Sequence, residues 1–291
     1  MATQIATSIE DRIATITMDG PDRLNAMTAA AMDAFVAALD AVDRDDEVRV
    51  VIVTGAGRAF CAGTDLSGGF DLPSGGDPAT GVGIPADVGG KVTLRLYRMN
   101  KPVIGAIKGA AVGFGASVTL PMDVRIASAD ARFGFVFTRR GIVAESCSSW
   151  FLPRIVGQAT ATEWMISGRM IGCEEALQKG LLHEVVEGDD VLTRAREMAA
   201  DIIANTAPVS VALTRRLLWQ MLGAETPEIA HEFESRALVA ALSLDDAGEA
   251  VAAFKAKRPA RFSGSVSGND LGARWWPAGR ASAPVDRGSR D

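Results

Sequence analysis

Glu145 is the acidic residue whose surroundings most favour proton-transfer chemistry. It is the only charged residue in the run from Gly141 to Pro153. A carboxylate in apolar surroundings has its charged form disfavoured, so its pKa rises and it can exchange protons near neutral pH. A second interpretation stays open, in which Glu145 begins a helix or pairs with Arg140 or Arg154.

Two glycine-rich turns carry backbone amides that are suited to binding an anion. They are residues 59–66 (AFCAGTDL) and 109–117 (GAAVGFGAS). Glycine lets the backbone approach a ligand closely, and amides at a helix N-terminus stabilise a developing negative charge. Taken singly, each segment is also typical of an ordinary turn. The second resembles a dinucleotide-binding turn, but Val118 stands where that motif has its third glycine, so a Rossmann-type oxidoreductase is not favoured.

The cysteines and histidines do not form a pattern typical of metal or disulfide chemistry. The chain has three widely spaced cysteines and two histidines, with no CxxC or Cys/His cluster: Cys61, Cys147, Cys173, His183 and His231. We therefore expect no metal site and no disulfide framework, and we interpret both histidines as structural. Cys147 also has no neighbouring histidine that would activate it as a nucleophile.

Alternating strand and helix patterns in the first half predict the elements that position these residues. Residues 4–18 alternate as in a β-hairpin, and Thr28 is suited to cap a helix. The stretch 55–90 holds eleven glycines and is typical of a ligand-binding loop. The alternation predicts an α/β fold with largely parallel sheets, with further strands at 48–54, 102–107 and 124–127 and a helix at 91–99.

The second half is dominated by helical periodicity. Pro208 and Pro227 stand at plausible helix starts. Six helices are predicted, over 158–167, 173–179, 190–205, 208–222, 226–241 and 245–257. We divide the chain into a core at 1–200, a helical region at 201–262 and a flexible tail at 263–291, in which Trp275 and Trp276 are suited to docking on a neighbouring surface.

Composition excludes several classes of protein. The chain has 291 residues, of which 48% are hydrophobic, and its net charge is −6. Such a chain can bury a core, and its acidic balance disfavours nucleic acid and anionic membranes as partners. The N-terminus lacks a signal-peptide pattern, and the longest largely apolar run, 109–122, is too short to span a bilayer. We expect a soluble, cytoplasmic protein.

The order and spacing of four segments resemble the enoyl-CoA hydratase/isomerase superfamily, also called the crotonase family, over residues 5–262. The segments are AFCAGTDL at 59–66, IKGAAVGFGAS at 107–117, LPMDVRIAS at 120–128 and LPRIVG at 152–157. The resemblance implies a crotonase-like spiral of ββα units followed by C-terminal helices that mediate trimer formation. It implies an acyl-CoA substrate, no separate cofactor, and a homotrimer or dimer of trimers. The backbone amides of Thr64 and Phe114 would form an oxyanion hole for the thioester carbonyl.

Two departures from the family pattern bear on the reaction. The positions of the two hydratase glutamates fall on Ser117 and Phe137, which cannot serve as acids or bases. Glu145, four residues after Gly141, resembles the single catalytic glutamate of peroxisomal-type Δ3,Δ2-enoyl-CoA isomerases. The resemblance thus favours an isomerase. Hydration by a variant route, another crotonase reaction such as thioester hydrolysis, and non-catalytic acyl-CoA binding stay open.

The resemblance also implies which residues contact the substrate. The adenine of CoA would be read mainly through the backbone of the first turn, and Phe137 would help to exclude water. A basic residue near the C-terminal helices, Lys257 or Arg258, would reach a phosphate, although both also fit a solvated helix end. The acyl chain would run along residues 66–95. The substrate-contacting set is Ala62, Gly63, Asp65, Leu66, Phe137 and Lys257.

Overall fold

A computed structural model describes residues 2–69, 85–188 and 190–267 of the chain. The chain packs as two units, residues 1–206 and 207–291, which are described separately. The predicted end of the core, residue 200, lies inside helix α7 (Val191–Asn205). The first packing unit ends at residue 206, just beyond that helix. The threefold domain division stays a prediction.

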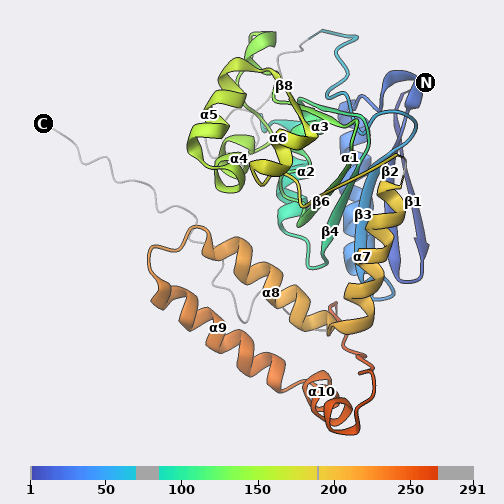
Figure 1. The fold of residues 1–291 in the computed structure, drawn as a ribbon, viewed down its shortest axis with the longest axis vertical. Helices are drawn as coiled ribbons and strands as arrows, with labels where there is room; N and C mark the ends of the chain where they lie inside the picture. Colours follow the sequence, from blue (N-terminus) through green and yellow to red (C-terminus); the bar gives the residue numbers. More distant parts are fainter. Residues whose placement is uncertain (1, 70–84, 189, 268–291) are drawn as a thin grey trace, which may run out of the picture. The chain divides into compact units, whose positions relative to one another are not determined.

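The first unit is built on a six-stranded sheet with the order β1-β2-β3-β4-β6-β9 (Figure 1). Strands β1 and β2 form the predicted antiparallel hairpin, and every other neighbouring pair is parallel. The predicted α/β fold with a largely parallel sheet is therefore confirmed. The strand bounds are β1 (Gln4–Glu10), β2 (Ile13–Asp19), β3 (Val50–Gly55), β4 (Val103–Ile107), β6 (Val124–Ser128) and β9 (Glu184–Val186).

A second sheet has three short strands, and the first of them lies within the glycine-rich segment 109–117. Its order is β5-β7-β8, with β5 parallel to β7 and β7 antiparallel to β8. Three-residue strands carry too little periodicity to be recognised from sequence, so these were not predicted. They are β5 (Ala110–Val112), β7 (Arg132–Gly134) and β8 (Met170–Gly172).

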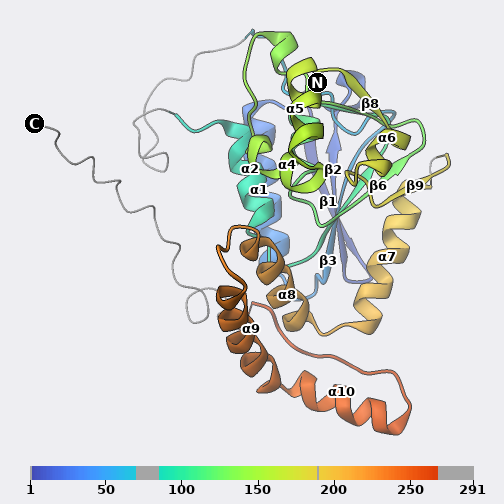
Figure 2. The same cartoon turned by 60° about the vertical axis from the view of Figure 1, so that its left-hand side comes forward.

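Helices cover both faces of the large sheet (Figure 2). Helix α7 packs its small buried residues Ala195 and Ala199 against apolar side chains of β2, β3, β4 and β6. Helices α1 and α2 lie on the opposite side (Figure 2). The remaining helices of this unit belong to the small sheet and its connections. The bounds are α1 (Ala29–Arg44), α2 (Val88–Tyr97), α3 (Phe114–Ser117), α4 (Ser148–Val156), α5 (Gln158–Ser167) and α6 (Cys173–Gln178).

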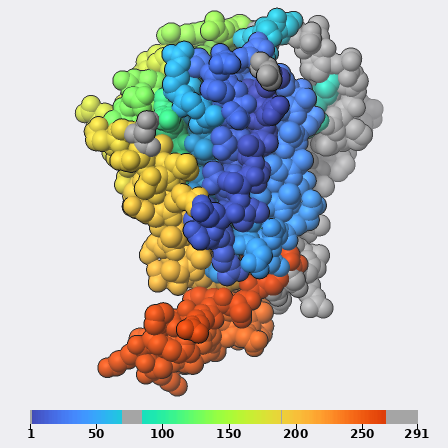
Figure 3. All heavy atoms as spheres, turned by 90° about the vertical axis from the view of Figure 1, so that its right-hand side faces the viewer, coloured from blue at the N-terminus to red at the C-terminus, as the bar shows by residue number. Residues whose placement is uncertain are grey.

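Strand β1 is the exposed edge of the large sheet. All of its residues except Ile5 are exposed, whereas β2 is buried along most of its length. Figure 3 shows β1 on the surface of this face. The hairpin thus shields the parallel strands from solvent, and the buried core begins at β2.

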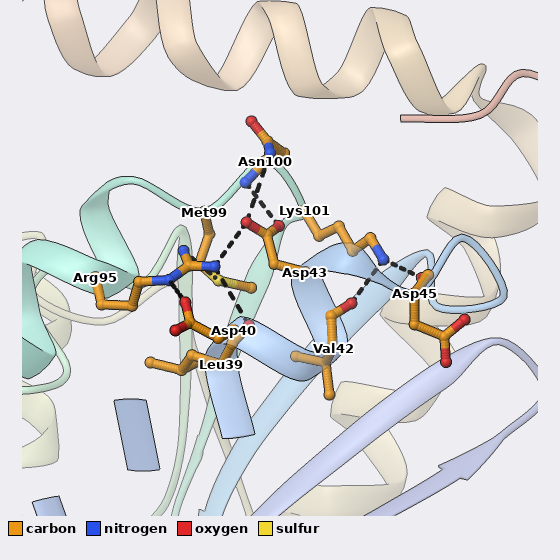
Figure 4. A network of polar contacts seen from close by, with 9 residues as sticks. All are labelled: Leu39, Asp40, Val42, Asp43, Asp45, Arg95, Met99, Asn100 and Lys101. Atoms are coloured by element: carbon orange, nitrogen blue, oxygen red, sulfur yellow. Dashed lines mark hydrogen bonds and ion pairs between the residues drawn. The ribbon is translucent and has the colours of Figure 1, made fainter. Parts of the chain in front are cut away.

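Helix α2 is fixed to helix α1 by a cluster of charged groups (Figure 4). The Arg95 guanidinium donates to Asp40 Oδ1 at 2.5 Å and to Asp43 Oδ2 at 2.8 Å. The backbone amide of Asn100 donates to Asp43 Oδ1 at 3.0 Å. The Lys101 ammonium, 2% exposed, donates to the backbone carbonyl of Val42 at 2.6 Å. These contacts fix the axis of α2, and with it the helix end that faces the site described below.

We expect Arg95→Met to lower the free energy of unfolding by about 3 kcal/mol. The variant removes both ion pairs, including the one with Asp43, which is 8% exposed. Urea unfolding measures the loss. Arg196→Met is the control, because its partner Glu10 is 71% exposed and such pairs contribute less than about 1 kcal/mol. Equal losses in the two variants would contradict this prediction.

Two helices of the first unit differ from the sequence prediction. Helix α2 begins at Val88 rather than residue 91, because Asp87 caps it and glycines fill its first turn. Helix α4 was not predicted, because Pro153 lies inside it. The capping role of Thr28 is confirmed, since its hydroxyl accepts from the Ala31 amide at 3.2 Å.

The described part of the second unit, residues 207–267, contains three helices, α8 (Pro208–Met221), α9 (Pro227–Leu242) and α10 (Asp245–Ala256). Their small core contains Val209, Leu213 and Ala237, together with Val266 from beyond α10. Asp246 accepts from the amide of Ser263 at 2.9 Å. Ser263 and Val266 are therefore in contact with the helices, and the flexible tail at 263–291 stays a prediction. Trp275 and Trp276 lie outside the described residues.

Candidate active site

The first glycine-rich turn is held between two neighbouring segments. The amide of Met27 donates to the Gly63 carbonyl at 2.8 Å, and the amide of Asp65 donates to the Met27 carbonyl at 2.9 Å. These two bonds flank Thr64, so its own amide points away from Met27. Gly63 has φ +108°, in the region that favours glycine. The turn therefore presents the Thr64 amide on its open side.

The second glycine-rich turn lies directly against the first. The Cys61 amide donates to the Ala110 carbonyl at 3.0 Å, and the Val112 amide donates to the Cys61 carbonyl at 2.9 Å. Gly113, at φ +55°, then turns the chain into α3, which begins at Phe114. The first amides of a helix have no partner within it.

The two candidate donor amides are neighbours. A methyl group added at Gly63 would lie 2.8 Å from the Val112 carbonyl oxygen and 3.8 Å from the Phe114 nitrogen. Within the described part of the chain, neither the Thr64 amide nor the Phe114 amide has a hydrogen-bond acceptor. Two adjacent, unused amides at this position can together bind one oxygen atom that carries negative charge.

Glu145 reaches this region from a sharp turn that precedes α4. Ser146 and Cys147 both have left-handed backbone conformations, with φ +56° and +55°. Such conformations cost about 1–2 kcal/mol per non-glycine residue. The Glu145 carbonyl holds the turn by accepting from the Ser148 amide at 3.0 Å and from the Ser148 hydroxyl at 2.6 Å. This strained turn sets the direction of the Glu145 side chain.

The Glu145 carboxyl group lies beside α2 and the Phe114 ring. A methyl group added at Gly89, in the first turn of α2, would lie 2.8 Å from Glu145 Oε2 and 3.0 Å from Phe114 Cδ2. The same methyl group would lie 2.1 Å from Ser146 Oγ. Glycine at position 89 therefore makes the space that Glu145 occupies. Within the described residues, Glu145 Oε1 and Ser146 Oγ are buried and have no hydrogen-bond partner.

Burial, and after it the nearby negative charge of Asp87, raise the pKa of Glu145 to about 7. A carboxyl group with such a pKa can accept and return a proton at neutral pH. The structure thus places the Glu145 carboxyl group beside Phe114, the first residue of α3 and the residue that carries one of the two unused amides.

Other expected site residues occupy different surroundings. Ser117 is fully buried with no hydrogen-bond partner for Oγ among the described residues, and Phe137 is 4% exposed. Leu66 is 42% exposed. Asp65 accepts from the Ser67 amide at 2.9 Å, which lowers its pKa, and it pairs with Arg23. None of these side chains adds a second base.

The expected phosphate-binding residues lie in the second unit. Lys257 ends α10 in a left-handed conformation at φ +51°. Arg258 forms a two-pronged ion pair with Glu249 at 2.6 and 2.8 Å. Because the two units are described separately, Lys257 is not placed relative to Glu145, and its role stays a prediction.

The sequence prediction missed Asp87 and Gly89. Both lie within the stretch 55–90, which was interpreted as an irregular loop. The signal that was available is an Asp followed by a short helical pattern, which is typical of a capped helix start. Within 2–69, 85–188 and 190–267, no cluster of three or more metal-ligating residues occurs. No described helix is long and apolar enough to cross a membrane.

The sequence matches one family model over most of its length. The model is that of enoyl-CoA hydratase/isomerase, and it matches residues 8–265. The chain is an acyl-CoA enzyme of mixed α/β fold with a helical C-terminal region. It belongs to the enoyl-CoA hydratase/isomerase family, the crotonase superfamily, and the expected fold class is confirmed.

Individual relatives agree on the family and differ in their reactions. Enoyl-CoA hydratase ACTT3 from Alternaria alternata is 40% identical, over 87% of this chain and 83% of that protein. The 1,2-epoxyphenylacetyl-CoA isomerase from Escherichia coli K12 is 31% identical, over 89% of this chain and 98% of that protein. The crystal structure of enoyl-CoA hydratase from Mycobacterium tuberculosis H37Rv superposes with a TM-score of 0.79 at 30% identity, covering 90% and 99% of the two chains. The finer similarity to peroxisomal-type isomerases stays a prediction.

Proposed function

We propose that this enzyme shifts a double bond in an acyl-CoA thioester from the 3- to the 2-position, as a Δ3,Δ2-enoyl-CoA isomerase. The observation that carries the proposal is the arrangement of Glu145 beside two unused amides, with no carboxyl group at Ser117 or Phe137. A double-bond shift needs one base that returns its proton, whereas hydration needs groups that both activate water and protonate carbon.

In the proposed mechanism, the amides of Thr64 and Phe114 bind the thioester carbonyl oxygen. Glu145 removes a proton from C2, and the electron pair moves onto the carbonyl oxygen to give a dienolate. The amides stabilise that charge, and each such donor typically contributes about 3 kcal/mol. Glu145 then returns the proton to C4 on the same face. The reaction is redox-neutral and needs no cofactor.

The other substrate contacts in this proposal come from the first turn and the second unit. Backbone groups from Ala62 to Asp65 would bind the CoA adenine, and Lys257 would reach a phosphate. The buried ring of Phe137 would keep water from the dienolate, which protects it from side reactions. Assembly as a homotrimer or a dimer of trimers belongs to the same proposal.

Hydration is a second candidate function, and two observations favour it. The relative from Alternaria alternata described above is named as a hydratase. The carboxyl group of Asp87 also lies close enough to Glu145 to change its ionisation. Two neighbouring carboxyl groups can divide the work of activating water and protonating carbon.

The test is to follow the ultraviolet absorbance of the conjugated thioester with two substrates. With an isomerase, the absorbance rises when a 3-enoyl-CoA is added and changes little when crotonyl-CoA is added. A fall with crotonyl-CoA at comparable rates, without the rise, would replace the proposal by hydration. Tight acyl-CoA binding with no change of absorbance for either substrate would show that the protein binds acyl-CoA without catalysis.

We expect the isomerase kcat/KM to increase with pH up to a midpoint near 7 and then level off. Glu145 must be ionised to accept the C2 proton, and its pKa is raised to about 7 by burial first and by Asp87 second. Below the midpoint, the rate should fall about tenfold per pH unit. Initial rates between pH 5 and 9 measure this profile. A flat profile across that range would contradict the role of Glu145.

A further inference from the structure

Asp87 is a second carboxyl group at the end of α2, and it has no role in the isomerase mechanism described above. Its Oδ1 accepts from the Gly90 amide at 2.7 Å and so caps the helix. A methyl group added at Gly90 would lie 2.3 Å from Asp87 Oδ2. The absence of a side chain at position 90 therefore lets the Asp87 carboxyl group fold back over the first turn of α2.

Glu145 approaches the same helix end from the turn before α4. Its Oε2 occupies the space beside Gly89, the residue that precedes Gly90. The Asp87 and Glu145 carboxyl groups therefore lie beside two consecutive residues of the first turn of α2, Gly90 and Gly89. Two carboxyl groups in contact can form a hydrogen bond only when at least one of them holds a proton. The positive end of α2, a helix of ten residues, favours negative charge on both.

The other ionisable groups near this pair are Cys147 and Arg98. Burial raises the pKa of the Cys147 thiol, and a hydrogen bond with Thr93 opposes that effect. The negative charges of Asp87 and Glu145 both act on Cys147, whereas Arg98 acts on it in the opposite direction. Among the described residues, no lysine or arginine contributes to the shift of Glu145 itself. Burial is the largest cause of the raised pKa of Glu145, and Asp87 is the charged residue that adds to it.

We propose that Asp87 is a positioning residue for Glu145: its carboxyl group, at the same end of α2, accepts a hydrogen bond from Glu145 once that group has taken the substrate proton. This inference rests on the proposed function. Before the reaction the Glu145 carboxyl group is ionised. After proton abstraction one proton lies on Glu145, donated toward Asp87. The pair thereby keeps the proton in place until it moves from Glu145 to C4, which returns Glu145 to its ionised form.

Asp87→Asn tests the proposal, because asparagine caps a helix about as well as aspartate but carries no charge. The midpoint of kcat/KM against pH should fall by about one pH unit, as expected when a coupled pair becomes a single group. The plateau rate should fall about threefold to tenfold, because Glu145 becomes a weaker base. Asp33→Asn, which removes an exposed carboxylate from α1, should leave both values unchanged.

A helix-capping role alone would give a different result. Asp87→Ala removes both the cap and the charge, so it should lower the melting temperature and move the pH midpoint as Asp87→Asn does. If Asp87 acts only as a cap, Asp87→Asn would behave like the wild type in both measurements. An unchanged pH midpoint in Asp87→Asn, with Glu145→Gln inactive, would overturn the inference and leave the proposed function standing.

A second measurement does not depend on turnover. Glutamate labelled with ¹³C at the carboxyl carbon allows the Glu145 signal to be assigned by its loss in Glu145→Gln and then titrated by NMR. The Glu145 midpoint should be lower in Asp87→Asn than in the wild type, and equal midpoints would overturn the pairing. If the wild type does not isomerise a 3-enoyl-CoA, the proposed function fails, and this titration still decides whether the two groups interact.

Discussion

Replacing Glu145 by glutamine is expected to reduce the isomerase kcat by about 10²–10⁴-fold, the usual contribution of a general base. Glutamine has nearly the same shape but cannot accept the C2 proton. The amides of Thr64 and Phe114 are unchanged, so the affinity for acyl-CoA should stay within a few-fold of the wild type. Initial rates with a 3-enoyl-CoA and calorimetric binding of a saturated acyl-CoA separate the two effects. Activity within threefold of the wild type would remove Glu145 from the mechanism.

Stability measurements provide the control for this variant. Burial raises the pKa of Glu145 from 4.5 to about 7 in the folded protein. Between those values the folded state retains a proton that the unfolded state has released, so stability falls as the pH rises. Glutamine does not ionise, so Glu145→Gln should be more stable above pH 7, by up to about 3 kcal/mol. An inactive variant that is at least as stable as the wild type has lost chemistry rather than structure.

Replacing Gly115 by alanine is expected to lower activity by about 10²-fold or more, the usual effect of misplacing a reactive group by about 1 Å. The new methyl group would lie 2.0 Å from the Cys61 carbonyl oxygen and 2.9 Å from Cys61 Cβ. One of the two turns must therefore shift, and the Phe114 amide shifts with it. The free energy of unfolding should also fall, by about 1–3 kcal/mol for such overpacking. Activity assays and urea unfolding measure both losses.

Gly248→Ala is the matched control, because Gly248 is an exposed position inside α10 with no atom within 4 Å of an added methyl group. Alanine there should stabilise the protein by about 0.5–1 kcal/mol and leave the activity unchanged. If Gly115→Ala behaved like Gly248→Ala, the contact between the two glycine-rich turns would not position the donor amides.

Long periodic elements could be predicted from the sequence because their patterns are local. The hairpin at 4–18, the helix after Thr28 and the helix at 158–167 all appear near the expected bounds. Elements of three residues, such as β5 and β8, were not predicted. Their stability comes from pairing with distant strands, and three residues show no recognisable period. The Pro153-containing α4 was missed because proline disfavours a helix interior.

The sequence alone determined the residue types of the candidate site. One glutamate in an uncharged run and two glycine-rich turns are visible at 145, 59–66 and 109–117. The family resemblance that these segments support is confirmed. Side-chain type is a local property, so the absence of carboxyl groups at Ser117 and Phe137 is equally clear from the sequence.

Only the tertiary structure decided which groups meet. Gly89 and Asp87 are more than fifty residues from Glu145 in the chain, yet Gly89 makes the space for its carboxyl group and Asp87 acts on its ionisation. The contact depends on the axis of α2, which Arg95 fixes to α1. No local pattern specifies a distance across three separate segments, because burial and electrostatic interaction depend on the packing of the whole unit. The pKa of Glu145 is therefore a property of the fold, whereas its identity is a property of the sequence.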